Sequence, residues 1–389
     1  MLDGSIIHFG IGKYLQKIEN YELYAIIDTH LGKKFFEQQN LINFKKEWFF
    51  QDNIKNDNSN KTLDLEYLSN FEKKYNINLW QIAYSDIVLN KYNNFYKFSY
   101  DEIILIYQQI CKFFEKIVLE IKPDFLIIRP TDYSDNQILH GLCKALKIKI
   151  LTLGSARLGN MNIISTDVDK FDNIAMLNEN SLDTISKDQL KKSLEGYATQ
   201  QKLFQSRYQK SWNKKLMSVL KIIRLVFDFK YQDFFEHKGR NFFSLIWIQV
   251  IFSIKLFQMN KYTSKKFEKN IPVEKEYMYF PLHLQPERST LVAAPFYENL
   301  LEVIKNIAKS IPVEFILLVK EHPRQITYGW RDKTFYKQIE NLPNVKLIHP
   351  SVSNEKLIEN SSLVITVAGT TGLEAVVQGK PAIVFADVI

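Results

Sequence analysis

Residues 312–385 contain four apolar runs separated by polar, helix-forming segments: VEFILLVK at 313–320, NVKLI at 344–348, LVITV at 363–367 and PAIVF at 381–385. Short apolar runs of this kind are typical of strands that are buried on both faces of a parallel sheet, with helices as their connections. Such sheets bind ligands at the carboxyl ends of their strands, where helix N-termini point. The stretch therefore predicts a Rossmann-like half-domain.

Two of these strand ends are followed by unusual loops, Glu-His-Pro at 321–323 and Ala-Gly-Thr-Thr-Gly at 368–372. Glycines let the backbone approach a guest closely, and free amides at a helix N-terminus favour a phosphate. Thr371 and Glu374 also have capping-box spacing, so capping alone is the alternative for this pair. For His322 the alternative is a turn residue positioned by the following proline. Neither loop matches a P-loop or a dinucleotide fingerprint, yet together they favour a nucleotide.

A third motif lies upstream, where Tyr277–Thr290 reads YMYFPLHLQPERST. The combination of FPLHLQPERST, KEHP and AGTTGLEAVVQGKPAIVF resembles the bacterial capsule and surface-polysaccharide synthesis family of glycosyltransferase-like proteins, which includes the CMP-Kdo-dependent capsule transferases. The resemblance covers about residues 275–389. It implies a GT-B-like α/β fold, in which two Rossmann-like domains flank a cleft and the C-terminal domain holds a nucleotide sugar.

Carried onto this sequence, the resemblance implies that Gln285 and Glu287 line the cleft, that His322 contacts the donor phosphate, and that Thr370 and Thr371 hold the nucleotide. No DxD motif is evident, so we predict no metal and no other cofactor. The helix dipole and His322 would then stabilise the leaving phosphate. The predicted donor-site residues are Gln285, Glu287, Lys320, Glu321, His322, Pro323, Gly369, Thr370, Thr371, Gly372 and Glu374.

Polar residues also follow a predicted strand in the first domain, where FLIIRP at 125–130 leads into TDYSDN at 131–136. A carboxylate at this position could act as general base towards an acceptor hydroxyl. Asp132 is the candidate base, and Asp135 is expected to cap the helix that follows. Beyond the next strand, Arg157 has two interpretations: a partner for an anionic substrate, or one half of a surface salt bridge.

Most of the positive charge lies between residues 202 and 269, where fifteen Lys and Arg and four Asp and Glu give +11, against +8 for the whole chain. The segment includes FFSLIWIQVIFSIKLF at 242–257, which is short for a bilayer span. Three interpretations stay open: helices lying on the anionic cytoplasmic face of the inner membrane, a helical linker packed on a domain, and a true span. No nucleic-acid-binding motif accompanies the charge, so nucleic acid is not an expected partner.

Length and composition predict a folded protein with more than one core. At 389 residues, with 46% hydrophobic and 24% charged residues, the expected domains are 1–200, 201–270 and 271–389, the middle one being a basic helical connection. Cys111 and Cys143 are expected to be buried thiols in a reducing compartment. The N-terminus MLDGSIIHFG lacks the basic and apolar regions of an export signal, which predicts a cytoplasmic location.

These patterns predict a glycosyltransferase that moves a sugar from a nucleotide donor to a capsule, lipopolysaccharide or other surface-glycan or glycolipid acceptor. A CMP-sugar such as CMP-Kdo is the first donor considered and a UDP-sugar the second. One alternative is a UDP-sugar epimerase of the 2-epimerase type, which needs no second substrate. The other is a non-catalytic, membrane-tethered assembly protein, favoured because C-terminal domains of GT-B proteins usually continue as helices after the last strand, whereas this sequence ends at Ile389.

Overall fold

The computed structural model of the chain describes residues 3–19, 21–29, 32–54, 62–91, 95–155, 162–167, 172, 189, 192–193, 234–271 and 275–386. Two compact units are present, Met1–Leu153 with Ser211–Leu245, and Gly154–Lys210 with Ile246–Ile389. Both contain helices and parallel strands, which confirms the predicted α/β class. The division assigns residues 234–245 to the first unit, whereas the sequence predicts a separate connecting segment there.

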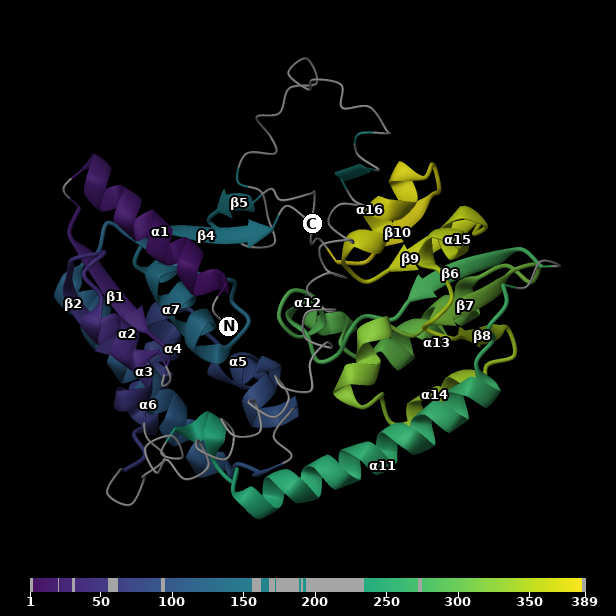
Figure 1. Cartoon of the computed structure of the whole chain (residues 1–389), viewed down its shortest axis with the longest axis horizontal. Helices are drawn as coiled ribbons and strands as arrows, with labels where there is room; N and C mark the ends of the chain where they lie inside the picture. Colours follow the sequence, from purple (N-terminus) through teal and green to yellow (C-terminus); the bar gives the residue numbers. More distant parts are fainter. Residues whose placement is uncertain are drawn as a thin grey trace. The chain divides into compact units, whose positions relative to one another are not determined.

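The first unit contains two parallel strand pairs among helices (Figure 1). β1 pairs with β2, and β3 pairs with β4. The predicted strands around 125–130 and 149–153 are thereby confirmed. The elements of the first unit are α1 (Asp3–Ile18), β1 (Leu23–Ile27), α2 (Lys33–Gln38), β2 (Phe44–Phe49), α3 (Phe50–Asn53), α4 (Leu65–Tyr75), α5 (Leu79–Ser85), a π-helix (Ile87–Lys91), α6 (Tyr100–Ile121), β3 (Phe125–Ile128), α7 (Ser134–Ala145), β4 (Lys149–Ser155) and a 3₁₀ turn (Phe235–His237). The short strand β5 (Asn162–Ser165), which follows β4 in the chain, is assigned to the second unit.

Helix α6 is the centre of the first core. It starts with a capping box, in which the Ser99 hydroxyl accepts a hydrogen bond from the Glu102 amide while the Glu102 carboxylate accepts one from the Ser99 amide. One face of the helix is fully buried and packs against α7 through apolar side chains, each worth about 1.5–3 kcal/mol of transfer free energy. The two cysteines, Cys111 and Cys143, are free and buried in this core, as predicted.

The second unit has one five-stranded parallel sheet with the order β10-β9-β6-β7-β8. This order, with the first strand β6 in the middle, is that of a doubly wound fold. Its elements are α11 (Phe242–Lys266, which begins in the first unit), β6 (Tyr277–Pro281), α12 (Arg288–Leu291), a 3₁₀ turn (Pro295–Tyr297), α13 (Leu300–Ser310), β7 (Ile316–Lys320), a 3₁₀ helix η6 (Pro323–Tyr328), α14 (Lys333–Glu340), β8 (Val345–Ile348), α15 (Asn354–Glu359), β9 (Leu363–Thr366), α16 (Thr370–Val377) and β10 (Ala382–Val384).

The sheet of the second unit is covered on both faces. Alternate residues of β7 belong to different hydrophobic clusters, Leu317 and Val319 to one and Ile316 and Leu318 to the other. Every residue of β7 is buried as a result. A continuous apolar run such as VEFILLVK is what a strand with two covered faces requires, so the sequence-based prediction of a parallel sheet is confirmed.

The long helix α11 corresponds to the apolar part of the basic segment. It is the one helix in the described part of the chain that is long and apolar enough to cross a membrane by length and composition. Its C-terminal half packs on the second unit, where Met259 and Thr263 are buried. Figure 1 shows this half running beside α14, in agreement with the contact of the Phe267 and Tyr336 rings. Residues 202–233 of the predicted basic segment lie outside the described part.

Candidate functional site

Three loops meet at the carboxyl edge of the sheet in the second unit, because they follow the neighbouring strands β9, β6 and β7. The chain goes from β6 outward to β7 and β8, and then returns to β9 and β10 on the other side. Open parallel sheets bind their ligands at such a reversal of strand order. The loop after β6, residues 282–287, therefore lies between the two loops at 321–323 and 368–372 that the sequence indicates.

His283 joins the loops after β6 and β9. Its Nε2 atom accepts a hydrogen bond from the Ala368 amide at 3.2 Å. In the neutral ring the proton must therefore reside on Nδ1. Next to Ala368, Gly369 has a φ of +98°, and a Cβ there would lie 3.7 Å from the His283 ring. A side chain at Gly369 would thus be strained by its backbone conformation more than by lack of space. Sequence analysis missed His283 as a site residue, although its LHLQP motif is part of the family resemblance.

His322 is poised to donate one hydrogen bond from Nε2. Its side chain caps the 3₁₀ helix η6, because Nδ1 accepts a hydrogen bond from the Arg324 amide at 3.2 Å. Burial lowers the pKa of His322 to about 4, assisted by the nearby cations Arg324, Lys320 and Arg331. The imidazole is therefore neutral near pH 7, and its proton is on Nε2.

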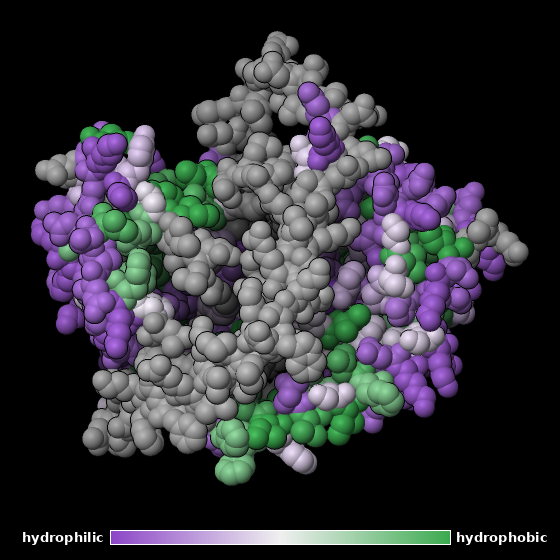
Figure 2. Space-filling view, viewed as in Figure 1, coloured by the Kyte–Doolittle hydropathy of each residue, from purple (hydrophilic) through white to green (hydrophobic). Residues whose placement is uncertain are grey.

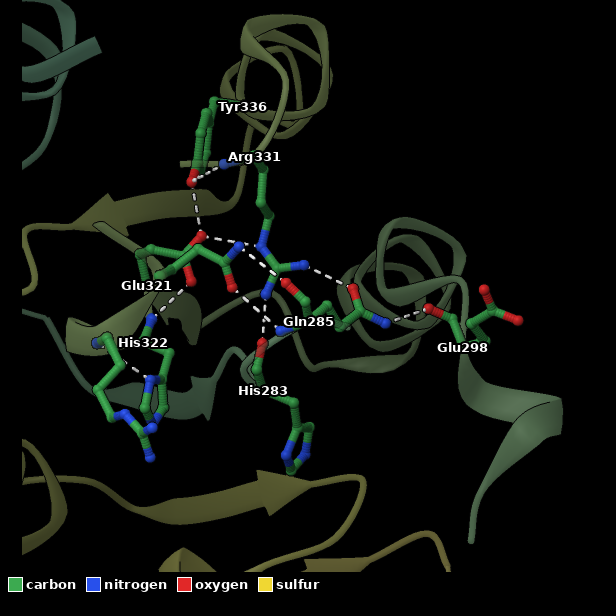
Figure 3. A network of polar contacts seen from close by, with 9 residues as sticks. His283, Gln285, Glu298, Glu321, His322, Arg331 and Tyr336 are labelled. Atoms are coloured by element: carbon green, nitrogen blue, oxygen red, sulfur yellow. Dashed lines mark hydrogen bonds and ion pairs between the residues drawn. The ribbon is translucent and has the colours of Figure 1, made fainter. Parts of the chain in front are cut away.

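A buried ion pair supports the His322 loop from behind (Figure 3). Arg331 Nε lies 2.9 Å from Glu321 Oε2, and Tyr336 donates its hydroxyl proton to the same oxygen at 2.6 Å. The other oxygen of Glu321 accepts a hydrogen bond from the His322 amide at 2.6 Å. Both carboxylate oxygens are therefore occupied by protein groups. Glu321, predicted to bind the donor, instead has the geometry of a residue that positions His322.

Gln285 is bonded to the same network through every polar group it has. Its side-chain oxygen accepts from Arg331 at 2.5 Å, and its side-chain nitrogen donates to the Glu298 carbonyl at 2.8 Å. Its backbone exchanges two hydrogen bonds with the Gln325 amide group, at 2.9 and 3.0 Å. Arg331 also donates to the His283 carbonyl. Gln285 was predicted to line the site, and the structure places it beneath the site as a support.

Lys320 and Glu374 interact electrostatically near the start of α16. Lys320 ends β7 and is buried, and its ammonium donates a hydrogen bond to the Asn354 side chain. Burial lowers the pKa of Lys320 to about 8, against the opposing influence of Glu374. Burial likewise raises the pKa of Glu374, while a hydrogen bond with Thr370 and the charge of Lys320 act in the opposite direction. Three predicted site residues, Lys320, Thr370 and Glu374, are thus brought together.

Helix α16 begins two residues earlier than a Thr371 cap would require. Its N-cap is Gly369, which makes no side-chain capping bond, and Thr370 is the first helical residue. The predicted capping box of Thr371 and Glu374 is therefore wrong. The physical reason is the left-handed φ of Gly369, which turns the chain into the helix without a side-chain cap. Gly369 has no side chain that could cap the first amides of α16, and amides at a helix N-terminus suit an anion.

Lys320 gives this edge of the sheet a pH-dependent stability. Its pKa is about 8 in the folded chain, against about 10.4 for an unfolded lysine, so the unfolded chain holds more protons between these values. Folding stability should therefore rise with pH across this window. We expect Lys320→Met to be more stable than the wild type at pH 7, and this difference in melting temperature to shrink towards pH 10. A pH-independent difference between the two proteins would contradict the assigned titration.

Three other residues of the predicted donor site are either exposed or involved in the packing of the fold. Glu287 is exposed at the start of α12, and its side chain does not cap that helix. Pro323 is exposed and begins η6, the position a proline suits best. Gly372 lies in the first turn of α16, where a Cβ would come within 2.8 Å of Val384. This glycine therefore allows close packing of the helix against β10. Arg157 lies outside the described residues.

Acidic side chains gather at one place in the first unit. Burial raises the pKa of Asp135 to about 7, helped by the charge of Asp28, which follows β1. Burial also raises the pKa of Glu236, and Asp28 and Asp135 add to that shift. Asp135 was expected to cap α7, which is wrong: Tyr133 occupies the N-cap and Asp135 lies in the first turn. Asp132, the predicted base, lies three residues earlier and is partly buried.

One curated protein is similar to a part of this chain. Protein FixF of Sinorhizobium fredii is 26% identical over 133 residues, which make up 33% of this chain and 30% of that protein. The similarity thus spans less than a third of the curated relative.

Several solved structures match over most of the chain with low scores. The β-Kdo 2,7 transferase of KpsC from Thermosulfurimonas dismutans is 11% identical, with a TM-score of 0.35 and coverage of 94% of this chain and 79% of that one. UDP-GlcNAc 2-epimerase from Neisseria meningitidis is 15% identical, with a TM-score of 0.25 and coverage of 94% and 82%. Scores this low assign neither an activity nor a fold.

The family comparison covers more of the chain than the curated relative does. A family model described as "Capsule polysaccharide biosynthesis protein" matches residues 187–388, which is 202 of 389 residues. The match includes β6, β7 and β9 and all three loops that meet at the reversal of strand order. With more than half of its length matched, and with the conspicuous loops inside that match, the chain belongs to the capsule polysaccharide biosynthesis protein family.

Proposed function

We propose that this protein is a glycosyltransferase of surface-polysaccharide assembly that takes its sugar from a nucleotide donor. One observation carries the proposal: groups that suit a phosphate belong to the strand ends and loops at the reversal of strand order. These groups are the Nε2–H of His322, the first amides of α16 and the ammonium of Lys320. Membership of the capsule family supports the same activity.

The three groups favour an anion in different ways. The amides at the N-terminus of α16 offer hydrogen bonds and the positive end of the helix dipole. His322 adds a neutral donor that stays in one tautomer because Arg324 occupies its other nitrogen. Lys320 adds a buried charge, which the approach of a phosphate would stabilise. A leaving nucleoside phosphate gains negative charge as the glycosidic bond breaks, so donors fixed in advance would accelerate that step.

We propose a CMP-sugar as the first donor to test and a UDP-sugar as the second, because the family resemblance includes CMP-Kdo-dependent capsule transferases. The acceptor would be a capsule, lipopolysaccharide or other surface glycan, or a glycolipid. The site of action would be the cytoplasm, at the inner face of the inner membrane, where nucleotide sugars and lipid-linked acceptors are both accessible.

On the first unit we propose Asp135 as the general base for the acceptor hydroxyl, ahead of Asp132. A base is most effective when its pKa lies near the working pH, and burial brings the pKa of Asp135 to about 7. The transfer rate should then rise with pH through about 7. We expect Asp135→Asn to lose this limb of the pH–rate profile and Asp132→Asn to retain it. If only Asp132→Asn abolishes the rise in rate through about pH 7, Asp132 is the general base, as predicted from the sequence.

Acceptor-dependent release of CMP from a CMP-sugar tests the proposed activity. The expected result is CMP formation that needs both the sugar nucleotide and a membrane-derived glycan or glycolipid fraction. Conversion of a UDP-sugar to its epimer without any acceptor would contradict the proposal and establish an epimerase. Absence of turnover together with absence of nucleotide binding would leave the non-catalytic assembly role.

A further inference from the structure

The outer side of α11 carries a continuous apolar stripe. Trp247, Val250, Ile251, Ile254 and Phe257 follow one another at helical spacing, and each exposes between 44% and 71% of its surface. All five belong to the second unit. Figure 2 shows hydrophobic side chains along this helix, at the lower edge of the view. Soluble proteins rarely leave so many large apolar side chains together in water, so the stripe requires a partner.

The opposite side of α11 is fixed to the second unit. Met259 and Thr263 are buried there, and Trp330 Nε1 donates a hydrogen bond to Asn260 at 2.8 Å. The Phe252 ring lies over Gly329, where an added Cβ would come within 2.7 Å of it. These contacts hold the helix in one rotational setting about its axis. The stripe is therefore the side that the fold of this unit leaves uncovered.

The charge around the stripe identifies the partner. The segment Phe242–Lys266 contains no acidic residue, whereas Lys255, Lys261, Lys265 and Lys266 are all exposed. Lys261 and Lys265 continue the stripe from Phe257 at intervals of four residues, so they lie on the same side of the helix. An apolar band followed by ammonium groups on one face complements the acyl chains and anionic headgroups of a lipid leaflet.

The packed side of α11 also determines how the helix can meet lipid. From Met259 onward one side of the helix is packed into the second unit, which leaves Phe242–Ile254 as the longest uncharged part before that packing. At about 1.5 Å per residue this part is roughly 20 Å long, against about 30 Å of hydrocarbon in a bilayer. The free part of the helix is therefore too short to span a bilayer. Because the stripe is exposed, the interpretation of α11 as a linker packed on a domain is excluded as well. These features are those of a helix that lies in the interface between the lipid headgroups and the acyl chains.

We propose that α11 docks this protein on the surface of an anionic lipid bilayer, with Trp247, Ile254 and Phe257 in the acyl boundary and Lys261 and Lys265 at the headgroups. This docking surface specifies how the protein would reach the membrane location of the proposed function. It rests on that location and does not depend on which nucleotide sugar is the donor. Docking would hold the loop at Gly329, which precedes Arg331 of the buried network, close to the leaflet. An acceptor anchored in the same leaflet would then be confined to the plane in which the enzyme is held.

Flotation with lipid vesicles, in the absence of nucleotide, tests this inference. The full chain is mixed with vesicles of phosphatidylglycerol and phosphatidylethanolamine in equal parts, or of phosphatidylcholine alone. We expect it to float with the anionic vesicles and not with the neutral ones. The double variant Trp247→Ser, Phe257→Ser should lose at least about tenfold in partition, because two aromatic anchors are removed from the stripe.

A matched control uses Phe296→Ser with Val313→Ser, two exposed apolar residues of the same unit that lie outside α11. This control should float like the wild type, and thermal unfolding should show that both double variants are folded. Failure of the wild type to float with anionic vesicles would overturn the inference. So would equal loss in both double variants, or a lipid-free oligomer that only the Trp247, Phe257 variant disrupts. Because no nucleotide is present, these results are independent of the donor proposal.

Discussion

Replacing Glu321 with alanine is expected to lower the free energy of unfolding by about 3–5 kcal/mol, the usual cost of removing one partner from a buried ion pair. Both members of the pair are buried, since the side chains of Arg331 and Glu321 expose 8% and 0% of their surface. The substitution leaves the Arg331 charge without its carboxylate and removes the acceptor of the Tyr336 hydroxyl and the His322 amide. Urea denaturation of wild type and variant measures the change.

The exposed pair of Lys346 and Glu268 provides the control. Their side chains expose 46% and 50% of their surface at a separation of 3.6 Å, so water screens the interaction. Lys346→Ala should change the unfolding free energy by less than about 1 kcal/mol. An equally small effect of Glu321→Ala would show that the network of Figure 3 contributes little to the fold, and the positioning role assigned to Glu321 would have to be withdrawn.

Removal of the His322 imidazole is expected to reduce kcat by about 10²–10³, which is the cost of losing one fixed donor to a developing negative charge. The informative substitution is His322→Asn, because an asparagine oxygen can still accept the hydrogen bond from the Arg324 amide. This variant keeps the cap of η6 and loses only the Nε2–H group. It should therefore fold like the wild type and be nearly inactive in a transfer assay.

The pH dependence provides a second check on His322. Because its pKa is about 4, the neutral donor form persists from pH 5 to pH 8, and His322 should add no limb to the pH–rate profile there. A limb near pH 6.5 that His322→Asn abolishes would indicate a protonated histidine instead. His349→Ala, directly after the edge strand β8, should leave the transfer rate unchanged and serves as the control.

The arrangement of the second unit could be predicted from sequence because its signals are local. The run VEFILLVK predicts β7 by its unbroken apolar character, and LVITV predicts β9 in the same way. The loops after these strands are predicted to lie at one edge of a parallel sheet, and the structure confirms this edge, with the loop after β6 between them. The start of α16 predicted from the sequence is two residues too late, because a glycine with positive φ and a threonine cap are both common at helix starts.

The buried network could not be predicted, because it depends on contacts between distant residues. Arg331 follows an unremarkable Gly-Trp pair, and nothing local shows that it reaches both Glu321 and Gln285. The capping role of Asp135 looked natural from its spacing, whereas its raised pKa comes from burial and from Asp28 more than a hundred residues away. His283 lies in the FPLHLQPERST motif that carries the family resemblance, yet that resemblance implies its neighbours Gln285 and Glu287 as the cleft residues.

In the proposed function, the reversal of strand order in the second unit holds the phosphate of a nucleotide donor. Calorimetric titration of CMP, UDP and CDP into the wild type and His322→Asn tests it most directly. We expect CMP to bind the wild type and its affinity to fall at least about tenfold in the variant, as for the loss of a hydrogen bond to a charged group. If no nucleotide binds the folded wild type, or if His322→Asn binds CMP with unchanged affinity, the assigned donor site is contradicted.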